Sequence, residues 1–379
     1  MKVITLTPNP ALDLSGHVKG LVPNEKNYVF AERRDPGGNG INAARIATRL
    51  TSGESGSRKI DVIATGWLGG AAGQEVKRLL DREKVGNSFL PISGETRTNV
   101  TVSNEATDQQ TRLTFPGPTI SRKEQQSLFR SLKRIQGEGL YVIGGSLPPG
   151  CPKTIHLEIA KIAARKGFGV IADVPAVILK PLLSKQKVTR RHPSGLGSKH
   201  TSELFMIKPN LAELEEWSGR KLGSQKAVIE AGIQLARKVC LVVVSLAEKG
   251  ALLIYGDQVW MAHAPKVKAK GTVGAGDSMV GAMAAVLLQY GIYLPEHVHQ
   301  LFSVEFAHQV FSLTVGNRKK PESKFGTQAA LNGRLPFALE DALSWGLAAG
   351  AATAEVSGTT LAQPSEIRRL HGQVRIQKL

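Results

Sequence analysis

Short, almost wholly apolar segments alternate with longer amphipathic ones along most of this chain of 379 residues, which limits the folds open to it. The apolar segments, each predicted as a buried strand, are residues 3–7, 60–65, 141–144, 169–173, 204–207, 239–245 and 251–255. The segments with helical spacing are residues 41–50, 73–83, 123–135, 154–166, 212–218 and 226–238. Continuous apolar strands joined by helices form a mostly parallel sheet that helices cover on both faces. The sequence therefore predicts an α/β fold with a doubly wound parallel sheet.

Two neighbouring segments interrupt this alternation. Residues 96–103 and 111–115 are rich in Thr and Val, alternate polar with apolar side chains, and have no helical segment between them. This pattern is typical of a β-hairpin and predicts a small antiparallel sheet beside the main one. With residues 14–30 the hairpin is expected to form a lid, whose segments span about 14–36 and 96–118.

The length of the chain is compatible with one large α/β domain or with two or three smaller ones. Because the pattern of strands and helices runs through most of the chain, we expect one domain over residues 1–379. Three stretches read as insertions into this domain: residues 52–59, 184–202 and 293–336, the last with a helix-like piece at 296–314.

The chain has 49 basic and 31 acidic residues, a formal net charge of +18. Nucleic acid, an anionic membrane and phosphorylated small molecules are all partners that such a charge attracts. The basic clusters at 180–199 and 318–324 lie in stretches of Pro, Gly and Ser that read as surface loops, and they have few aromatic side chains for base stacking. Solvated charge on insertions is therefore favoured over nucleic-acid binding, and nucleic acid is not an expected partner.

The two cysteines, Cys151 and Cys240, lie far apart and neither has a CxxC partner. This excludes a thiolate zinc site and favours a reducing compartment. The apolar start of the chain meets Pro8 and Asp13 too soon for a signal peptide, and no apolar run approaches the roughly 18–20 residues that span a bilayer. We expect a cytoplasmic protein with no membrane partner.

The strongest local signal is the run Gly-Thr-Val-Gly-Ala-Gly-Asp-Ser at 271–278, directly before a segment with helical spacing. Ligands of open α/β sheets bind at such turns, and a glycine turn that begins a helix offers free N–H groups to an anion. Asp277 would repel a bound phosphate, so two roles are open for it. It is either an N-cap of the helix, or a general base facing a hydroxyl that attacks the phosphate.

Other nucleotide-binding loops do not occur in the sequence. Nothing matches GxxxxGK[ST], and the run Gly-Gly-Asn-Gly at 37–40 does not match GxGxxG, because the third glycine is missing. The chain is therefore neither a P-loop NTPase nor an obvious Rossmann dehydrogenase.

The segment TVGAGDSMVGAM at 272–283 resembles the C-terminal signature of the ribokinase-like (PfkB) carbohydrate kinases. Six more stretches resemble the phosphofructokinase branch of that family and occur in its order: TPNPALD (7–13), PGGNGINAAR (36–45), TRTNV (96–100), GGSLPPG (144–150), KPNLAELEEWSGRKL (208–222) and VVSLAEKGAL (243–252). The resemblance covers nearly the whole chain outside the insertions. It implies a ribokinase-like fold and the phosphorylation of a sugar phosphate with ATP and Mg²⁺.

The resemblance implies that Asp277 takes the proton from the sugar hydroxyl as this hydroxyl attacks the γ-phosphate of ATP. The amides of Gly274, Ala275 and Gly276 would then form the anion hole for the migrating phosphoryl group. With a reference pKa of about 3.9 an aspartate is a weak base, which a loose phosphoryl transition state tolerates.

The resemblance also implies contacts with the nucleotide at Lys208, Asn210, Glu213, Ser245, Gly250 and Thr272. Asn210 and Glu213 have the N-x-x-E spacing of the element that organises Mg²⁺ and phosphate in the family, with Glu213 acting through water. The i, i+3 spacing places both on one helical face, and Mg²⁺ suits sparse carboxylate coordination completed by water and nucleotide oxygens. From the residues alone, Asn210 is as readily an ordinary helix N-cap after Pro209.

On the sugar side, the resemblance implies that Asp13 accepts hydrogen bonds from sugar hydroxyls and that Gly38, Asn39 and Asn42 hold further hydroxyls. Turn chemistry is the alternative for Asp13, and a plain N-cap with a structural glycine is the alternative for the other three. Position 39 is Asn where relatives often have Gly or Lys.

Arg97 and Lys26 fall where phosphosugar kinases of this branch place cations for the phosphate already on the substrate. A guanidinium suits this task because it binds phosphate through two parallel hydrogen bonds. For Lys26, a solvated loop lysine is the alternative.

The expected activity is the ATP- and Mg²⁺-dependent conversion of a fructose phosphate to fructose 1,6-bisphosphate, with 1-phosphofructokinase favoured over 6-phosphofructokinase and tagatose-6-phosphate kinase. A homodimer through the lid is possible. Two rivals are a kinase for an unphosphorylated sugar or nucleoside, and a non-catalytic nucleotide- or nucleic-acid-binding protein on a kinase fold.

Overall fold

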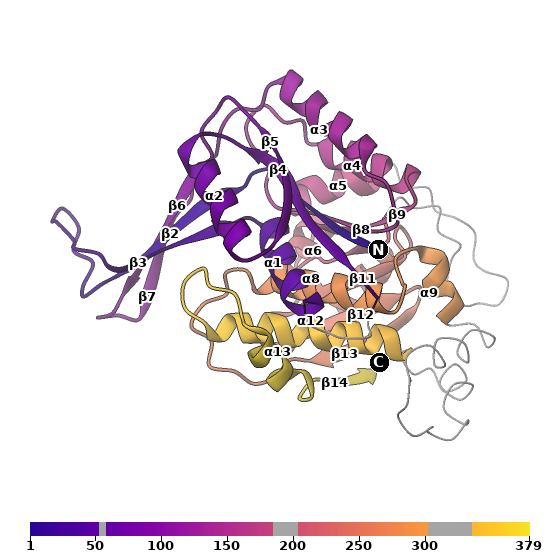
Figure 1. Cartoon of the computed structure of the whole chain (residues 1–379). Helices are drawn as coiled ribbons and strands as arrows, with labels where there is room; N and C mark the ends of the chain where they lie inside the picture. The colour runs from indigo at the N-terminus through magenta and orange to yellow at the C-terminus, as the bar shows by residue number, and fades with distance from the viewer. Residues whose placement is uncertain (53–57, 185–203, 302–335) are drawn as a thin grey trace.

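A computed structural model describes residues 1–52, 58–184, 204–301 and 336–379 of the chain (Figure 1). The greater part of the three predicted insertions, with most of the basic cluster at 180–199 and all of that at 318–324, lies outside the described residues. Of the helix-like piece predicted at 296–314, the described part belongs to helix α9 (Pro295–Leu301).

A ten-stranded sheet forms the centre of the molecule, in the order β14-β13-β12-β11-β10-β9-β8-β1-β4-β5. Its parallel part consists of β1 (Lys2–Thr7), β4 (Asp61–Leu68), β5 (Gly86–Pro91), β8 (Gly139–Gly144), β9 (Phe168–Asp173), β10 (Met206–Ile207) and β11 (Leu241–Ser245). Three antiparallel strands extend it beyond β11: β12 (Ala251–Tyr255), β13 (Gln258–His263) and β14 (Arg375–Lys378). The predicted mostly parallel α/β sheet is confirmed.

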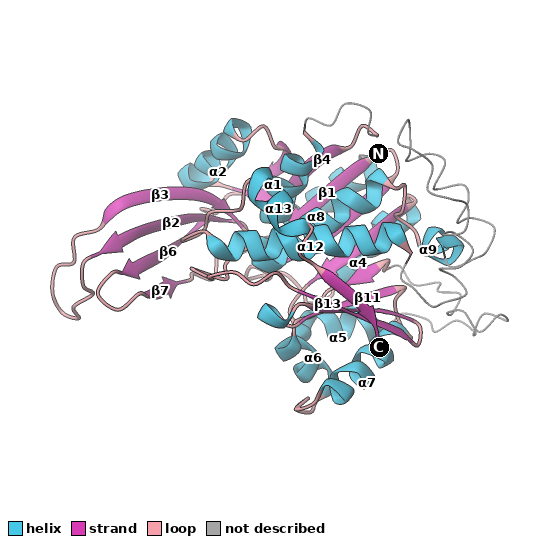
Figure 2. Cartoon of the chain, turned by 90° about the horizontal axis from the view of Figure 1, so that it is seen from below, coloured by secondary structure: helices cyan, strands magenta, loops and turns pink. Residues whose placement is uncertain are grey.

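Helices cover both faces of this sheet, because successive strand residues bury their side chains on opposite faces. Val3 and Leu140 belong to one apolar cluster, whereas their neighbours Ile4 and Tyr141 belong to the other. The first cluster packs against α1 (Asn39–Thr51), α2 (Gly70–Arg82), α8 (Ala275–Gln289), α12 (Phe337–Glu355) and α13 (Pro364–His371). The second packs against α3 (Arg122–Arg134), α4 (Ile155–Arg165), α5 (Ala176–Ser184), α6 (Leu211–Ser218) and α7 (Gln225–Ala236). Figure 2 shows α5, α6 and α7 on the opposite side of the sheet from α8, α12 and α13.

A second, four-stranded sheet extends from the main one as the predicted lid (Figures 1 and 2). Its strands, in the order β3-β2-β6-β7, are β2 (Ala11–Val18), β3 (Phe30–Gly37), β6 (Arg97–Asn104) and β7 (Gln109–Leu113). The predicted hairpin is confirmed, since β6 and β7 pair antiparallel, as do β2 and β3. The two inner strands, β2 and β6, pair in parallel, so the lid consists of two antiparallel pairs joined by a parallel one.

None of the helices in the described part of the chain is long and apolar enough to cross a membrane.

Candidate active site

The residues predicted for phosphoryl transfer and for the nucleotide lie at the carboxyl edge of the central strands. Strand β9 ends at Asp173, and Lys208 directly follows β10, its neighbour in the sheet. Helix α1 begins above the end of β1, because the Oγ1 of Thr7 accepts a hydrogen bond of 2.9 Å from the amide of Ile41. Helix α8 begins above the end of β10, where a Cβ atom on Gly276 would lie 3.3 Å from Lys208 Nζ. Two helix N-termini therefore meet at one edge of the sheet.

Asp277 is the third residue of α8 and lies next to α1. Gly274 occupies the N-cap position and no side chain caps the helix, so the N-cap alternative for Asp277 is wrong. The residue is half-buried, and its Oδ2 accepts a hydrogen bond of 2.9 Å from Asn42 Nδ2. Asn42 thus orients the side chain that the sequence marks as a base.

The environment of Asp277 changes its basicity. Burial, helped by the nearby charge of Asp173, raises the pKa of Asp277 to about 6, although the hydrogen bond from Asn42 and the charge of Lys208 oppose the shift. The expectation of a weak base near the reference pKa is therefore wrong. A carboxylate with a pKa of about 6 remains ionised at neutral pH and accepts a proton more readily than an ordinary aspartate.

The predicted anion hole lies at the first turn of α8, where helix geometry leaves N–H groups without intrahelical acceptors. Gly274 has a φ of 75°, and a Cβ atom there would lie 2.7 Å from Leu361 Cδ2, so this position requires glycine. The amide of Ala275 makes a long turn contact of 3.3 Å with the carbonyl of the exposed Thr272. The amides of Gly274 and Gly276 lie beside Asp277, and the anion hole of the three amides stays a prediction.

A buried lysine supplies positive charge under this turn. The Nζ of Lys208, whose side chain is only 5% exposed, lies 3.1 Å from Asp173 Oδ1. Burial alone would lower the pKa of Lys208, but the charges of Asp173, Glu213 and Asp277 outweigh it and raise that pKa. The ammonium therefore stays charged. Asp173 was missed in the sequence, although a carboxylate at the end of a buried parallel strand is a signal that could have found it.

Asn210 and Glu213 form a capping box at the start of α6. The amide of Glu213 donates to Asn210 Oδ1, and the amide of Asn210 donates to Glu213 Oε2, both at 2.9 Å. The N-cap alternative for Asn210 is thereby confirmed. Burial raises the pKa of Glu213, an effect that the charge of Lys208 opposes.

Two further residues predicted for the nucleotide lie along the same edge. Ser245 ends β11 and pairs with Asn210 through an isolated parallel bridge. Gly250 has a φ of 110°, and a Cβ atom there would lie 1.9 Å from the carbonyl oxygen of Ala262, so it is glycine because β13 passes close by. Gly250 therefore shapes the turn that joins β11 to β12.

Asp13 lies within strand β2 of the lid, so the turn alternative for it is wrong. It is buried and its Oδ1 accepts a hydrogen bond of 2.8 Å from Asn99 Nδ2, opposite it on β6. Burial raises the pKa of Asp13, while the Asn99 hydrogen bond and the charges of Arg112 and Arg97 act against this shift. Because paired residues share a face of a sheet and alternate residues return to it, one face of the lid holds all four side chains.

The guanidinium of Arg97 makes hydrogen bonds within the protein. Its Nη1 donates to the carbonyl of Phe115 at 2.9 Å and its Nη2 to the carbonyl of Asn9 at 2.8 Å, while Nε is buried without a hydrogen-bond partner. Arg112 on β7 is exposed and was missed in the sequence. Its position opposite Thr101, in the same hairpin, is the signal that could have identified it.

The remaining predicted sugar residues divide into two groups. Gly38 is the N-cap of α1 with a φ of 124°, and Asn39 lies against the turn after β8, since a Cβ atom on Gly145 would lie 3.1 Å from Asn39 Oδ1. Both stay close to Asn42 on the same helix. Lys26, by contrast, is exposed on the loop that joins β2 to β3 at the far tip of the lid (Figure 1). Within one chain it does not join the other sugar residues.

The following known proteins, which are similar to this chain in sequence or fold, are carbohydrate kinases. The 1-phosphofructokinase of Bacillus subtilis is 29% identical over 284 residues, which cover 75% of this chain and 84% of that protein. The tagatose-6-phosphate kinase of Staphylococcus epidermidis is 30% identical over 291 residues, which cover 76% of this chain and 85% of the other. The crystal structure of phosphofructokinase-2 from Escherichia coli in complex with potassium superposes with a TM-score of 0.74 at 26% identity, over 98% of each chain. The model of the pfkB family carbohydrate kinases matches residues 9–321, and the chain belongs to this family.

Proposed function

We propose that this chain transfers the γ-phosphoryl group of ATP to a fructose phosphate and forms fructose 1,6-bisphosphate, with 1-phosphofructokinase activity favoured. The observation that carries this proposal is the Asn42–Asp277 hydrogen bond at the N-terminus of α8. With this hydrogen bond, a carboxylate of raised pKa lies beside the glycine amides that would bind an anion, which supports the proposal.

The reaction follows from these neighbours. Asp277 takes the proton of the substrate hydroxyl while its oxygen forms a bond to the γ-phosphorus, and the bond from that phosphorus to ADP breaks. The amides of Gly274 and Gly276 and the ammonium of Lys208 face the charge that develops on the transferred group, which lowers the barrier. Asn42 keeps Asp277 in the orientation that this proton transfer needs.

A magnesium ion fits the part of the sheet edge where the carboxylates of Asp173, Glu213 and Asp277 lie near Lys208. Within the described ranges no three His, Cys, Asp or Glu side chains form a site that could hold a metal alone. Glu213 would hold Mg²⁺ through water, and nucleotide oxygens would complete its coordination. When bound, the ion neutralises phosphate charge.

A phosphorylated sugar is favoured over a plain sugar or a nucleoside by the lid. One face of the lid holds Arg97 and Arg112 together with Asp13, so cations for a phosphate share this face with a carboxylate that would accept hydroxyl hydrogen bonds. A non-catalytic binding protein would need neither the oriented Asp277 nor this carboxylate.

A coupled assay of ADP release tests the proposal with fructose 1-phosphate, fructose 6-phosphate, tagatose 6-phosphate, fructose and ribose as separate acceptors. We expect turnover with at least one phosphohexose, fructose 1-phosphate being the best, and little with fructose or ribose. Preference for an unphosphorylated acceptor would refute the phosphosugar assignment, and absence of turnover with all five would refute the proposed kinase.

A homodimer through the lid is part of the proposal. Seven large apolar side chains on the lid and its loops are more than a third exposed: Leu21, Val22, Tyr28, Val29, Phe30, Leu113 and Phe115. Exposed apolar side chains favour association, and a second copy of the lid is the proposed partner.

A further inference from the structure

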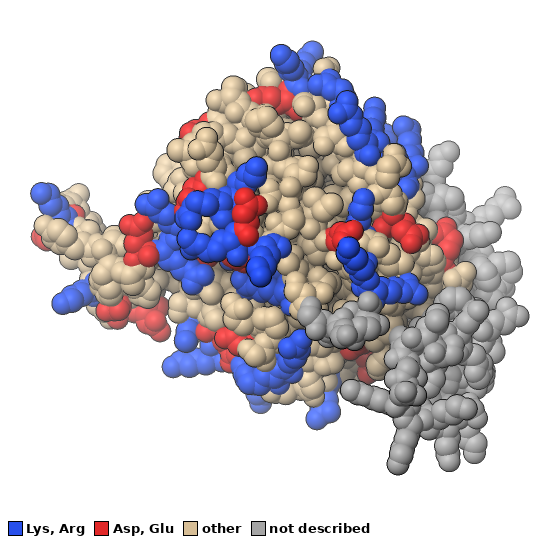
Figure 3. All heavy atoms as spheres, viewed as in Figure 1, with Lys and Arg blue, Asp and Glu red and all other residues tan. Residues whose placement is uncertain are grey.

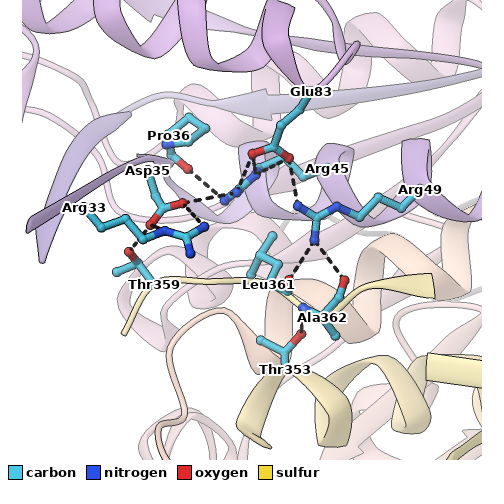
Figure 4. Close-up of polar contacts among 10 residues, drawn as sticks. All are labelled: Arg33, Asp35, Pro36, Arg45, Arg49, Glu83, Thr353, Thr359, Leu361 and Ala362. Carbon is cyan, nitrogen blue, oxygen red and sulfur yellow. Dashed lines mark hydrogen bonds and ion pairs between the residues drawn. The ribbon is translucent and has the colours of Figure 1, made fainter. Parts of the chain in front are cut away.

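One face of helix α1 contacts three different parts of the site. Asn42, Arg45 and Arg49 follow one another at i, i+3 and i+7, so they lie along one side of the helix. Asn42 holds Asp277 of α8, as described above. Arg45 and Arg49 bind the base of the lid and the segment between α12 and α13 (Figure 4).

Arg45 is fully buried, and all three nitrogens of its guanidinium have acceptors. Nε lies 3.0 Å from each carboxylate oxygen of Glu83, and Nη2 lies 2.6 Å from Glu83 Oε1. Nη1 donates to the carbonyl of Pro36 at 3.3 Å, and Nη2 lies 3.5 Å from Asp35 Oδ1. Because Asp35 and Pro36 belong to the last residues of β3, Arg45 joins α1 and the end of α2 to the base of the lid.

Arg49 and Asp35 extend this contact to the C-terminal part of the chain. Arg49 Nη1 donates to the carbonyls of Leu361 and Ala362 at 2.8 Å each, and its Nη2 donates to Glu83 Oε2 at 2.9 Å. Asp35 Oδ2 accepts a hydrogen bond of 2.9 Å from Thr359 Oγ1.

The same segment reaches the turn that begins α8, because the side chain of Leu361 lies directly against Gly274, leaving no space for a Cβ atom. A chain of direct contacts thus runs from the lid through Arg45, Glu83 and Arg49 to the turn that begins α8.

The cluster is built of charged side chains, although Arg45 and Asp35 are buried and Arg49 and Glu83 are only partly exposed. Burial would raise the pKa of Glu83, but the hydrogen bonds and charges of Arg45 and Arg49 outweigh it, so the pKa of Glu83 is lowered. Buried ion pairs are often no more stabilising than apolar side chains of similar volume. What a planar guanidinium adds is geometry, since it fixes several acceptors at set directions at once.

Beside this cluster, a groove of about 490 Å³ lies between the base of the lid and α2. Arg33 and Arg34 of β3 and Arg78 and Arg82 of α2 line the groove, and Asp35, Pro36 and Glu83 of the cluster line it as well. Figure 3 shows Lys and Arg side chains gathered over this part of the surface. The hydrogen bonds of Arg45 therefore join the lid to the core along one side of this groove.

We propose that Arg45 is a positioning residue that couples the base of the sugar-binding lid to the phosphoryl-transfer turn of α8. The expected change in kcat/KM rests on the proposed function. The expected change in hydrogen exchange rests on the contacts of Arg45 alone. Its role is to hold the acceptor of the phosphoryl group and the turn that binds this group in one mutual orientation.

The test compares Arg45→Lys with the wild type. Lysine keeps the buried positive charge beside Glu83 and Asp35 but loses the planar fork that reaches three partners. We expect kcat/KM for the phosphosugar to fall by about 10- to 100-fold, as a misplacement of about 1 Å does. Amide hydrogen exchange should become faster in both residues 33–37 and residues 271–276.

Thr359→Val serves as a second variant that disturbs the fold less. It keeps the shape of the side chain and removes the hydrogen bond to Asp35, so we expect the same two segments to exchange faster, with a smaller loss of kcat/KM. Arg78→Lys is the matched control, because Arg78 forms a similar pair with Glu75 at 2.6 Å on the exposed side of α2. It should leave both readouts unchanged.

The outcomes separate the inference from the function on which it draws. One contradicting outcome is a lower melting temperature and faster exchange in both segments, with kcat/KM within twofold of the wild type. This result would show a merely structural role and overturn the proposal. Faster exchange at the lid base alone would also overturn it, because the coupling to α8 would be missing. Should the wild-type chain turn over none of the phosphohexoses, the proposed function fails, while the exchange measurements still decide the coupling.

Discussion

For Asp277, the motif predicts the role of a base, whereas the pKa of the carboxyl group depends on the surrounding residues. The glycine turn was enough to mark it as a candidate base, but the sequence left an N-cap role open and placed its pKa at the reference value. The N-cap role is excluded because α8 begins at Gly274. The pKa depends on burial and on Asn42 and Asp173, which come near Asp277 only in the folded chain.

The first prediction concerns the replacement Asp277→Asn. The amide cannot accept the hydroxyl proton but keeps nearly the same shape, so we expect kcat to fall by about 10³-fold, within the usual contribution of a general base. ATP binding, measured by calorimetry, should be largely preserved because the glycine amides and Lys208 remain. Turnover near the wild-type value would refute the role given to Asp277.

The pH dependence of the reaction follows from the raised pKa. As a base Asp277 acts in its ionised form, so kcat/KM should be constant above about pH 6 and fall about tenfold per pH unit below it. Since the substrate phosphate also titrates near pH 6, the profile is compared with that of Asn42→Ala. This variant loses the hydrogen bond that lowers the pKa of Asp277, so its acid limb should lie at higher pH. An identical limb in both proteins would assign it to the substrate.

Arg112 is the better position for testing phosphate binding, because Arg97 also holds two backbone carbonyls. We expect Arg112→Ala to raise KM for the phosphosugar by about 10- to 100-fold, the equivalent of one hydrogen bond to a charged group, with kcat nearly unchanged. Steady-state kinetics with ATP at saturation measures this. An unchanged KM would remove Arg112 from the phosphate site.

The strands and helices that the sequence predicts are those with a strong local pattern. Most of the parallel strands and of the helices between them were found, since each has a continuous apolar run or a helical repeat. The edge strand β5 and the short helix α5 were missed. Strand β13 was missed although the two-residue turn of Gly256 and Asp257 between β12 and β13 is a hairpin signal. Strand β14 has only one apolar residue, Ile376, and only its pairing with β13 identifies it.

Long-range pairing was beyond the sequence. Asp13 and Asn99 are 86 positions apart, and nothing local indicates that β2 and β6 lie side by side in parallel. The hairpin of the lid could be predicted, but the pairing that places Arg112 and Asp13 on the same face depends on this register. The same is true of Asp35, Arg45 and Glu83, whose contact requires three elements.

The exposed apolar side chains of the lid allow a test of the proposed dimer. Tyr28 is 83% and Val29 is 53% exposed, so replacing both by Ser removes apolar surface without leaving a cavity. We expect a dimer for the wild type and a monomer for the double variant in sedimentation velocity at micromolar concentration. Val177→Ser on α5, where the side chain is 43% exposed, is the control and should remain dimeric. A monomeric wild type, or a dimeric double variant, would contradict the lid interface.

The net charge of +18 is a property of the complete chain rather than of the site, and it does not by itself decide between a small anionic substrate and a polyanion. Residues 53–57, 185–203 and 302–335, which the structure does not describe, carry 6 of these 18 charges, so most of the excess lies in the described part. In the described part, the site adds its own cations, Lys208 and Arg97, which are buried or half-buried. Charges in such positions are screened less by salt than exposed ones, so the two kinds of binding respond differently to ionic strength.

Salt therefore distinguishes the kinase from a nucleic-acid-binding protein. Between about 50 and 200 mM salt, a protein that contacts 6 to 10 phosphates loses about 10³ to 10⁵ in affinity for nucleic acid. For this chain we expect kcat at saturating ATP and phosphosugar to change by less than about twofold over that range, because the chemistry depends on the short, shielded contacts of Asp277 and Lys208. Binding of a labelled duplex, measured in parallel, should be weak at 50 mM and lost at 200 mM. Tight duplex binding that persists at 200 mM salt, together with absence of turnover, would favour the non-catalytic alternative instead.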